Sequence, residues 1–365
     1  MIKKMPLKNN FIDSMANRFA NKIKPNSENY TIKEGIIHLS SLLKDLKIFL
    51  DSVINFKIAK SLRDKFESII RFTQMQPLEG FLNNIPNDFR KIKSRDVSRL
   101  DNLFRERKKK ELRLLLDTVY EIDVLQSLSN LLDNKQYCLP EYDTNENPIF
   151  EVVDFVHPLL EKPVKNSFKL IKQNSLCLIT GPNMSGKSTF LKTIGLLTYC
   201  AHLGIPVPAS KMKTSIFNGL FTTINLSDNI NQGYSHFYAE VNRVKQMAIS
   251  LQDHNKIVVV LDELFRGTNV KDAYDGTLFI MDSLSKIKGS IFFISTHILE
   301  VADELKKLEN IDFRCFKSTV KGDEFKYDYN LKEGVTNERV GLQIIKNEGI
   351  GEILKQIIKN QEYNH

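Results

Sequence analysis

The residues that offer the clearest chemistry form a glycine-rich turn near the middle of the chain. Four residues separate Gly181 from Gly186, and Lys187, Ser188 and Thr189 follow directly. An apolar run precedes the turn and an apolar helical pattern follows it, which is the strand, loop and helix context of a P-loop. In such a loop backbone amides surround a phosphate, the lysine reaches the β- and γ-phosphates, and the serine hydroxyl ligates Mg²⁺. The nucleotide-contacting residues that we predict are Gly181, Pro182, Asn183, Met184, Ser185, Gly186, Lys187, Ser188 and Thr189.

An acidic pair narrows the reaction, because a P-loop alone is compatible with a kinase, a GTPase or an ATPase. The apolar run "KIVVVLD" ends in Asp262, and Glu263 is the next residue. Asp262 can hold Mg²⁺ together with Ser188, and Glu263 can polarise an attacking water. The alternative is a strand followed by an acidic helix cap. The pair favours ATP hydrolysis over transfer to a second substrate.

A histidine follows another apolar run of the same kind. His297 ends "SIFFISTH", so we expect it at the same sheet edge as the phosphates, in reach of the γ-phosphate or the lytic water. A lone histidine is more often structural or exposed, but its place after both nucleotide motifs favours a functional role. We therefore predict Glu263, His297 and Lys187 as the catalytic residues.

The elements that must position these residues differ between the two halves of the chain. We expect helices from residue 31 to about 135, with a capping box at Thr31 and Glu34 and one long helix over 94–132, roughly 55 Å in length. After a turn-rich segment, short apolar runs alternate with helical patterns, as in a buried parallel sheet wrapped by helices. The predicted fold is an α/β P-loop ATPase domain preceded by an all-α domain. The predicted domains are 1–135, 136–350 and a C-terminal tail, 351–365.

Composition narrows the class of protein. Lys plus Arg outnumber Asp plus Glu by 52 to 44, a formal charge of +8 that suits a polyanionic partner without requiring one. The four cysteines are scattered, unlike a zinc site or a disulfide framework. No run approaches the length of a membrane span or of a signal peptide. We therefore expect a cytoplasmic protein with no membrane partner.

The motifs together resemble one family. "TGPNMSGKST", "LDELFRGTN" and "STH" are similar to segments of the MutS mismatch-repair ATPases, which belong to the ABC class. "GYSHFYAEV" resembles the signature segment of that family, with Ser235, Phe237 and Glu240 at matching places. "IDVLQSLS" resembles the end of its lever helix, "VHPLL" the entry to its ATPase, and "YDYNLKEGVTNERVGLQI" its closing segment. The resemblance extends from about residue 115 to residue 350.

This resemblance implies a homodimer with composite ATP sites. In ABC-class enzymes the signature segment of one subunit completes the nucleotide site of the other, so Ser235 would act in trans. Residues 266–269 would lie at the subunit junction and couple the two sites. The alternative for Ser235 is an ordinary helix cap. The resemblance also gives the all-α half the role of a lever-helix domain.

The chain departs from the family in three respects, of which the first is that the Gly-rich part of the signature segment is reduced to Gly233. We expect neither the mismatch-recognition domain nor the connector domain in these 365 residues, and we interpret the Phe-x-Glu of Phe104 and Glu106 as accidental. "KPVKNSF" offers no aromatic residue where relatives stack the adenine, so Val164 or Lys165 would cover the base. Because the mismatch-recognition domain is not expected, we do not expect this chain to read a mispaired base directly.

A basic run leaves the macromolecular partner open. Clustered Lys and Arg in "RERKKKELR" (105–113) can neutralise DNA phosphates, although a charge run on a helix is more often a solvated face. The leading hypothesis is a dimeric, Mg²⁺-dependent MutS-like DNA repair ATPase. Its helical arms would contact the backbone of duplex DNA, with other repair proteins as further partners. The alternative is a nucleotide-switched adaptor that binds a protein partner and not DNA. A transporter ATPase is disfavoured because no membrane segment accompanies it.

Overall fold

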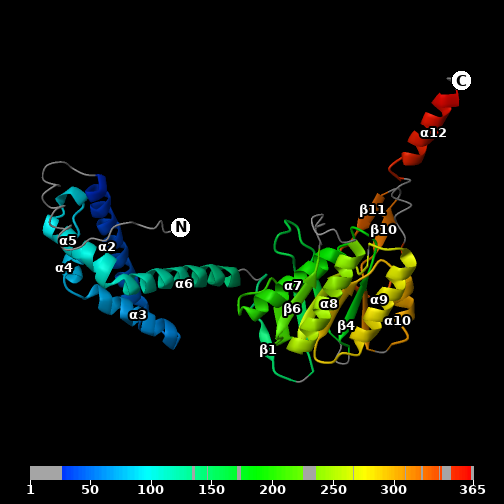
Figure 1. Cartoon of the computed structure of the whole chain (residues 1–365), viewed down its shortest axis with the longest axis horizontal. Helices are drawn as coiled ribbons and strands as arrows, with labels where there is room; N and C mark the ends of the chain where they lie inside the picture. Colours follow the sequence, from blue (N-terminus) through cyan, green and yellow to red (C-terminus); the bar gives the residue numbers. More distant parts are fainter. Residues whose placement is uncertain are drawn as a thin grey trace. The chain divides into compact units, whose positions relative to one another are not determined.

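The chain forms two compact units, residues 1–127 and 128–365 (Figure 1). The computed structural model describes residues 27–133, 136–145, 147–170, 174–224, 236–265, 267–308, 310–321, 324–336, 338 and 347–362. Within these residues no helix has the length and apolar character that crossing a bilayer would require.

Helices are the only regular secondary structure in the described residues 27–127 of the first unit. Its elements are α2 Ser27–Val53, α3 Lys60–Thr73, α4 Leu78–Leu82, the 3₁₀ turn η1 Phe89–Lys91, α5 Ser94–Asn102, the π-helical turn η2 Leu103–Arg107 and α6 Lys109–Asp133, which runs past the unit boundary. One apolar cluster joins them, with fully buried Leu43, Leu50, Leu78 and Leu115 at its centre. This agrees with the helical periodicity of the sequence.

The expected long helix over 94–132 is wrong, because the structure breaks it in two. Lys108 leaves the helical region, with φ −125° and ψ 30°, and its amide donates to the carbonyl of Leu103 five residues earlier. The π-helical turn buries Leu103 and Phe104 in the core of the unit. A straight helix cannot change which face it buries, so packing overrides the absence of Pro and Gly. The helix after the break is 25 residues long.

The expected capping box is also wrong, since α2 already begins at Ser27 and Thr31 and Glu34 lie inside it. The helix expected to start at residue 31 therefore includes four more described residues on its N-terminal side.

The second unit is built on a six-stranded sheet of described residues. Its strand order is β12-β9-β4-β8-β7-β6, and only β12 is antiparallel to its neighbour. The bounds are β4 Leu176–Thr180, β6 Gly219–Thr223, β7 Ile257–Asp262, β8 Ile291–Ser295, β9 Ile311–Cys315 and β12 Lys332–Glu333. Every residue of β4, β7 and β8 is buried, which explains their unbroken apolar runs. The predicted buried parallel sheet is thus confirmed.

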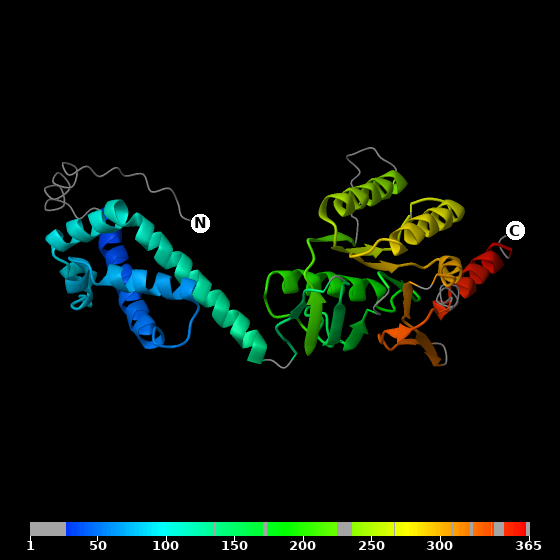
Figure 2. The same ribbon diagram turned by 90° about the horizontal axis from the view of Figure 1, so that it is seen from below.

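Different layers cover the two faces of this sheet (Figure 2). One face packs against α7 and a smaller sheet of order β1-β5-β2-β3, which the sequence did not predict. The other face packs against α8, α9 and α10. The bounds are α7 Lys187–His202, α8 His236–His254, α9 Val270–Ser285, α10 Leu299–Leu305, β1 Glu141–Asp143, β2 Phe150–Phe155, β3 Asn166–Lys169 and β5 Lys211–Ser215. Consecutive residues of one strand therefore enter different cores.

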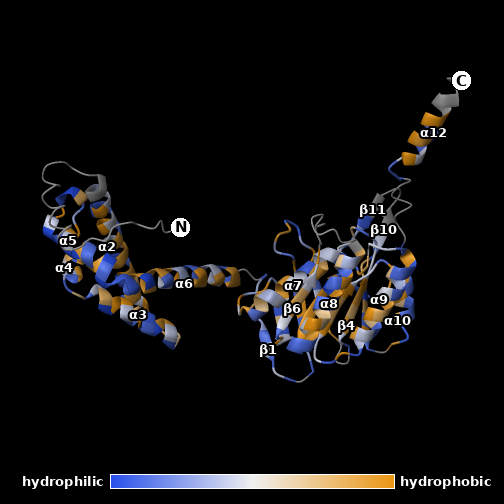
Figure 3. Ribbon diagram, viewed as in Figure 1, coloured by the Kyte–Doolittle hydropathy of each residue, from blue (hydrophilic) through white to orange (hydrophobic). Residues whose placement is uncertain are grey.

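The unit ends with a hairpin and a helix. The remaining elements are β10 Ser318–Lys321, β11 Glu324–Tyr327 and α12 Ile350–Glu362. Figure 3 shows apolar residues along α12. Its exposed large apolar side chains are Ile350, Ile353, Leu354, Ile357 and Ile358.

Candidate nucleotide-binding site

The neighbouring strands β4, β8 and β7 end at the same edge of the main sheet, and the predicted site residues lie at or directly after these ends. Ser295 on β8 pairs with Ile179 on β4 and with Asp262 on β7. Because the strands are parallel, the loop after β4, the acidic pair at the end of β7 and His297 after β8 leave the sheet on the same side. The structure therefore brings these motifs together as the apolar runs implied.

The loop between β4 and α7 has a backbone that favours glycine. Gly181 and Gly186 have φ values of 153° and 109°, and Met184 has φ 65°. A Cβ on Gly181 would lie 2.9 Å from the carbonyl oxygen of Phe316, closer than a real Cβ approaches. Glycine is therefore needed there both for its backbone conformation and for space. Gly186 is the N-cap of α7, so the loop ends on the amides of that helix terminus.

The lysine of this loop is buried against the loop itself. The Nζ of Lys187 donates to the carbonyl oxygens of Gly181 at 2.7 Å and Pro182 at 3.1 Å. Only 4% of its side chain is exposed. These bonds hold a buried cation beside the cavity that the loop borders.

The acidic pair and the histidine meet this lysine. The Oε1 of Glu263 lies 3.9 Å from Lys187 Nζ, and its Oε2 lies 3.3 Å from Nδ1 of His297. Glu263 has φ 57°, so its side chain is aimed by a turn that non-glycine residues rarely adopt. Asp262 accepts a hydrogen bond of 2.7 Å from Ser295 Oγ. A carboxylate is thereby fixed between a buried cation and an exposed imidazole.

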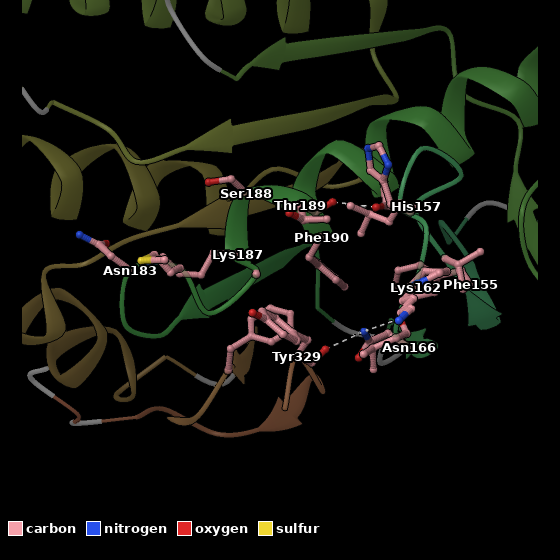
Figure 4. Close-up of a pocket in the computed structure, with 18 of the residues that line it drawn as sticks. Phe155, His157, Lys162, Asn166, Asn183, Lys187, Ser188, Thr189, Phe190 and Tyr329 are labelled. Atoms are coloured by element: carbon pink, nitrogen blue, oxygen red, sulfur yellow. Dashed lines mark hydrogen bonds between the residues drawn. The ribbon is translucent and has the colours of Figure 1, made fainter. Parts of the chain in front are cut away.

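A cavity of about 630 Å³ lies over the loop, within the size range of small-molecule sites (Figure 4). Its lining includes Asn183, Met184, Lys187, Ser188, Thr189 and Glu263. The buried Oγ of Ser185 has no hydrogen-bond partner among the described residues. Ser185 belongs to the loop but is not among the residues that line the cavity. The buried ammonium of Lys187 and the N-terminus of α7 form a donor set that fits the phosphates of a nucleotide. Ser188 lines the cavity and Asp262 ends the neighbouring strand β7, and both carry side-chain oxygens, the atom type that Mg²⁺ prefers.

The lining of the cavity also contains a residue that the sequence analysis missed. Tyr329 lines the cavity together with Val164, whereas Lys165 is not among the lining residues. The Nδ2 of Asn166 donates to the carbonyl oxygen of Tyr329 at 3.0 Å, and its Oδ1 accepts from the amide of Leu331 at 2.7 Å. Asn166 thus ties the segment after β11 to β3. The available signal is the segment "YDYNLKEGV", whose resemblance to the closing part of the family pattern does not by itself point to the site.

A second missed residue of the lining is His157, which follows β2. Burial lowers the pKa of His157, and the nearby Lys192 lowers it further. A neutral imidazole is therefore favoured at this position of the cavity lining.

Some predicted residues are not brought into the cavity. Ser235 and Arg266 lie outside the described residues. Asn269 is the N-cap of α9, where its Oδ1 accepts from the amide of Asp272 at 2.9 Å. This capping role explains why asparagine stands there without involving a second subunit.

A comparison with protein families shows to which family the chain belongs. The family described as MutS domain V matches residues 177–363, which include the loop, the acidic pair and His297. The chain belongs to the MutS family.

Curated MutS relatives cover different parts of the chain. The DNA mismatch repair protein MutS of Acetivibrio thermocellus is 27% identical over 360 residues, 90% of this chain and 41% of the relative. Those of Anaplasma phagocytophilum and Bacillus subtilis are 32% and 30% identical over 237 and 244 residues, each match covering 64% of this chain and 28% and 27% of the relative. The chain therefore spans less than half the length of these MutS proteins.

Proposed function

We propose that this MutS-family chain binds ATP with Mg²⁺ and hydrolyses it, and that its second unit is an ABC-type P-loop ATPase. The observation that carries this proposal is the convergence of Lys187, Glu263 and His297 at one sheet edge, beside a cavity of nucleotide size. Structural ion pairs rarely combine a buried lysine, a strained glutamate and a phosphate-type loop.

The loop residues 181–189 would hold the phosphates, and Lys187 would reach the β- and γ-phosphates. Ser188 and Asp262 would hold Mg²⁺, which neutralises charge between phosphate oxygens when it is bound. No group of three or more His, Cys, Asp or Glu side chains in the described part of the chain could hold a metal ion. This fits an ion that takes much of its coordination from the nucleotide and from water.

Glu263 would orient the attacking water and accept its proton. His297, 3.3 Å from the same carboxylate, would donate a hydrogen bond to the γ-phosphate region. Lys187 would stabilise the charge that develops on the transferred phosphoryl group. The three residues then act as one unit.

The adenine would lie in the cavity between Val164 and Tyr329. Val164 gives the apolar contact, and the Tyr329 ring gives an aromatic surface, since the aromatic residue of "KPVKNSF", Phe168, is buried and does not line the cavity. Asn166 would position Tyr329 through its bond to the Tyr329 carbonyl.

We also propose a homodimer in which Ser235 completes the partner's ATP site and residues 266–269 lie at the junction. The exposed apolar side chains of α12 support self-association, because contiguous exposed apolar surface is typical of interfaces. The ATP-bound dimer would close, change the geometry of the helical unit and reopen after hydrolysis.

The helical unit would act as a lever-helix domain and contact the backbone of duplex DNA. In the segment 90–113 the exposed basic residues are Arg90, Lys91, Lys93, Arg95, Arg99, Arg107, Lys109, Lys110 and Arg113, against one exposed acid, Glu106. Arg105 and Lys108 are instead paired with Asp101 and Glu111. Such an excess of positive charge fits phosphate contacts without base reading. The cellular role would be the repair of DNA mismatches or other DNA structures, with repair proteins as further partners.

The test is ATP turnover by the purified chain, with and without duplex DNA. Glu263→Gln is expected to lower kcat by roughly 100-fold or more while ATP still binds, because the amide cannot accept a proton. Glu67→Gln, an exposed change on α3, is the matched control and is expected to be neutral. Equal turnover by Glu263→Gln and the wild type would contradict the assigned base. A protein that stays monomeric and inactive with saturating MgATP would contradict the proposal as a whole.

A further inference from the structure

Ser295 is the last residue of β8 and lies at the centre of the proposed site. It is fully buried, and its register places it between β4 and β7. In the segment "SIFFISTH", the sequence predicts a role for His297 and none for Ser295.

The hydroxyl of Ser295 connects both acidic residues of the site. Its Oγ donates to Oδ1 of Asp262 at 2.7 Å and accepts from the backbone amide of Glu263 at 3.1 Å. The direction is fixed by chemistry, because a carboxylate only accepts and an amide N–H only donates. One buried hydroxyl therefore bridges the carboxylate assigned to Mg²⁺ and the backbone of the residue assigned as base.

The second bond falls where the chain has an unfavourable conformation. Glu263 has φ 57°, and its amide donates to this hydroxyl. The bridge thus supports the left-handed turn that aims the Glu263 side chain toward Lys187 and His297. Its first bond fixes the orientation of the Asp262 carboxylate.

We propose that Ser295 is a positioning residue that sets the Asp262 carboxylate and the Glu263 turn in one geometry for the Mg²⁺ nucleotide. This inference rests on the proposed ATP and Mg²⁺ site. It adds a residue that touches neither nucleotide nor metal but acts through both acidic groups. Loss of the hydroxyl would loosen the metal ligand and the base together.

The same pair of strands supplies a matched control. Ser290 precedes β8 at the opposite edge of the sheet, is also buried, and its Oγ accepts from the amide of Ile257 at 3.0 Å. Ser290→Ala removes a buried hydroxyl with a comparable backbone bond, at the sheet edge opposite the acidic pair. Any effect of Ser295→Ala that Ser290→Ala shares is therefore structural.

The first measurement is Mg²⁺-dependent binding of ADP by calorimetry, with ADP binding in EDTA as the reference. Ser295→Ala is expected to raise the Mg²⁺ concentration for half-maximal enhancement about tenfold, the lower end of the effect of outer-shell partners of a metal site. ADP binding in EDTA is expected to stay within about twofold, because the loop is untouched. Ser295→Thr, which keeps the hydroxyl, is expected to restore most of the Mg²⁺ response.

The second measurement needs neither nucleotide nor turnover. Hydrogen exchange of a peptide covering residues 261–265 in the free protein is expected to rise in Ser295→Ala and not in Ser290→Ala, because only the former removes the hydroxyl to which the Glu263 amide donates. Equal Mg²⁺ response and equal exchange in the two alanine variants would overturn the proposal. If the wild type fails to bind ADP or hydrolyse ATP, the proposed function fails, and the exchange result still decides whether Ser295 holds the turn.

Discussion

The two units differ in where they hold strained backbone. All non-glycine residues with positive φ among the described residues belong to the sheet unit: Asp154, Met184, Lys256, Glu263, Phe265 and Tyr329. Of these, Met184, Glu263 and Tyr329 line the cavity, and Phe265 lies two residues after Glu263. The described residues 27–127 of the helical unit contain none.

This difference indicates two ways of making a functional surface. The site of the sheet unit depends on the exact position of individual side-chain atoms. Those positions require turns with positive φ, which non-glycine residues disfavour and which the surrounding core must stabilise. The helical unit presents many exposed charges on relaxed helices, where no single position needs high precision. Substitutions should therefore act by geometry in one unit and by charge in the other.

Among the substitutions that compare the two units, the largest expected effect comes from a change of charge in the helical unit. Lys109→Glu with Lys110→Glu is expected to weaken duplex binding roughly 50-fold near 0.1 M salt, and to reduce the salt slope by about 2, as loss of two phosphate contacts predicts. Basal ATP hydrolysis should not change. The measurement is duplex affinity over a salt series.

The control is the same change of charge in the other unit. Lys306→Glu with Lys307→Glu alters adjacent lysines at the end of α10, which pair with Asp303 and Glu304. It is expected to leave duplex affinity nearly unchanged. Equal weakening by both variants would mean that net charge alone matters, and the absence of duplex binding by the wild type at low salt would favour the adaptor hypothesis.

The second prediction compares two Gly→Ala substitutions, one in each unit. Gly276 lies inside α9, and a Cβ there would sit 3.1 Å from two ring carbons of Phe265. Phe265 is buried, has φ 59° and packs against Phe237 at 5.6 Å between ring centroids, so its ring has little room to move. Gly276→Ala is expected to cost about 1 kcal/mol in the free energy of unfolding, the overpacking penalty less the gain in helix propensity. ATP turnover should fall because the Glu263 turn shifts.

Gly35 provides the opposite case, since it lies inside α2 and a Cβ added to it would meet nothing within 4 Å. Gly35→Ala is expected to stabilise the protein by about 0.5–1 kcal/mol through helix propensity alone. Denaturant unfolding of both variants checks the pair. The comparison between the units breaks down if both substitutions stabilise the protein to the same extent.

The smallest effect concerns a surface ion pair of the helical unit. Lys65 and Glu121 lie 2.6 Å apart, but their side chains are 39% and 38% exposed. Solvent screens such a pair, so Lys65→Ala is expected to cost no more than about 0.5 kcal/mol in the free energy of unfolding. Thermal unfolding at low and high salt measures it. A loss above about 2 kcal/mol at both salt concentrations, well beyond the range of an exposed pair, would show that this unit also depends on precise geometry.

The sequence by itself determined three strands of the main sheet and which motif residues lie together at its edge. The apolar runs of β4, β7 and β8 are read directly because every residue in them is buried, and motif residues placed at their ends must share an edge in a parallel sheet. Gly181 could likewise be read as a position where only glycine fits.

Only the tertiary structure decided the rest. The break at Lys108 follows from the burial of Leu103 and Phe104, which local propensity does not encode. Tyr329 is held at the cavity by Asn166, a residue 163 positions away in the chain, and Ser295 meets Asp262 across 33 positions. Such contacts depend on which strands become neighbours and in what register. Residue spacing along the chain does not indicate the strand order or the register, because both are fixed only when the two cores on either side of the sheet are formed.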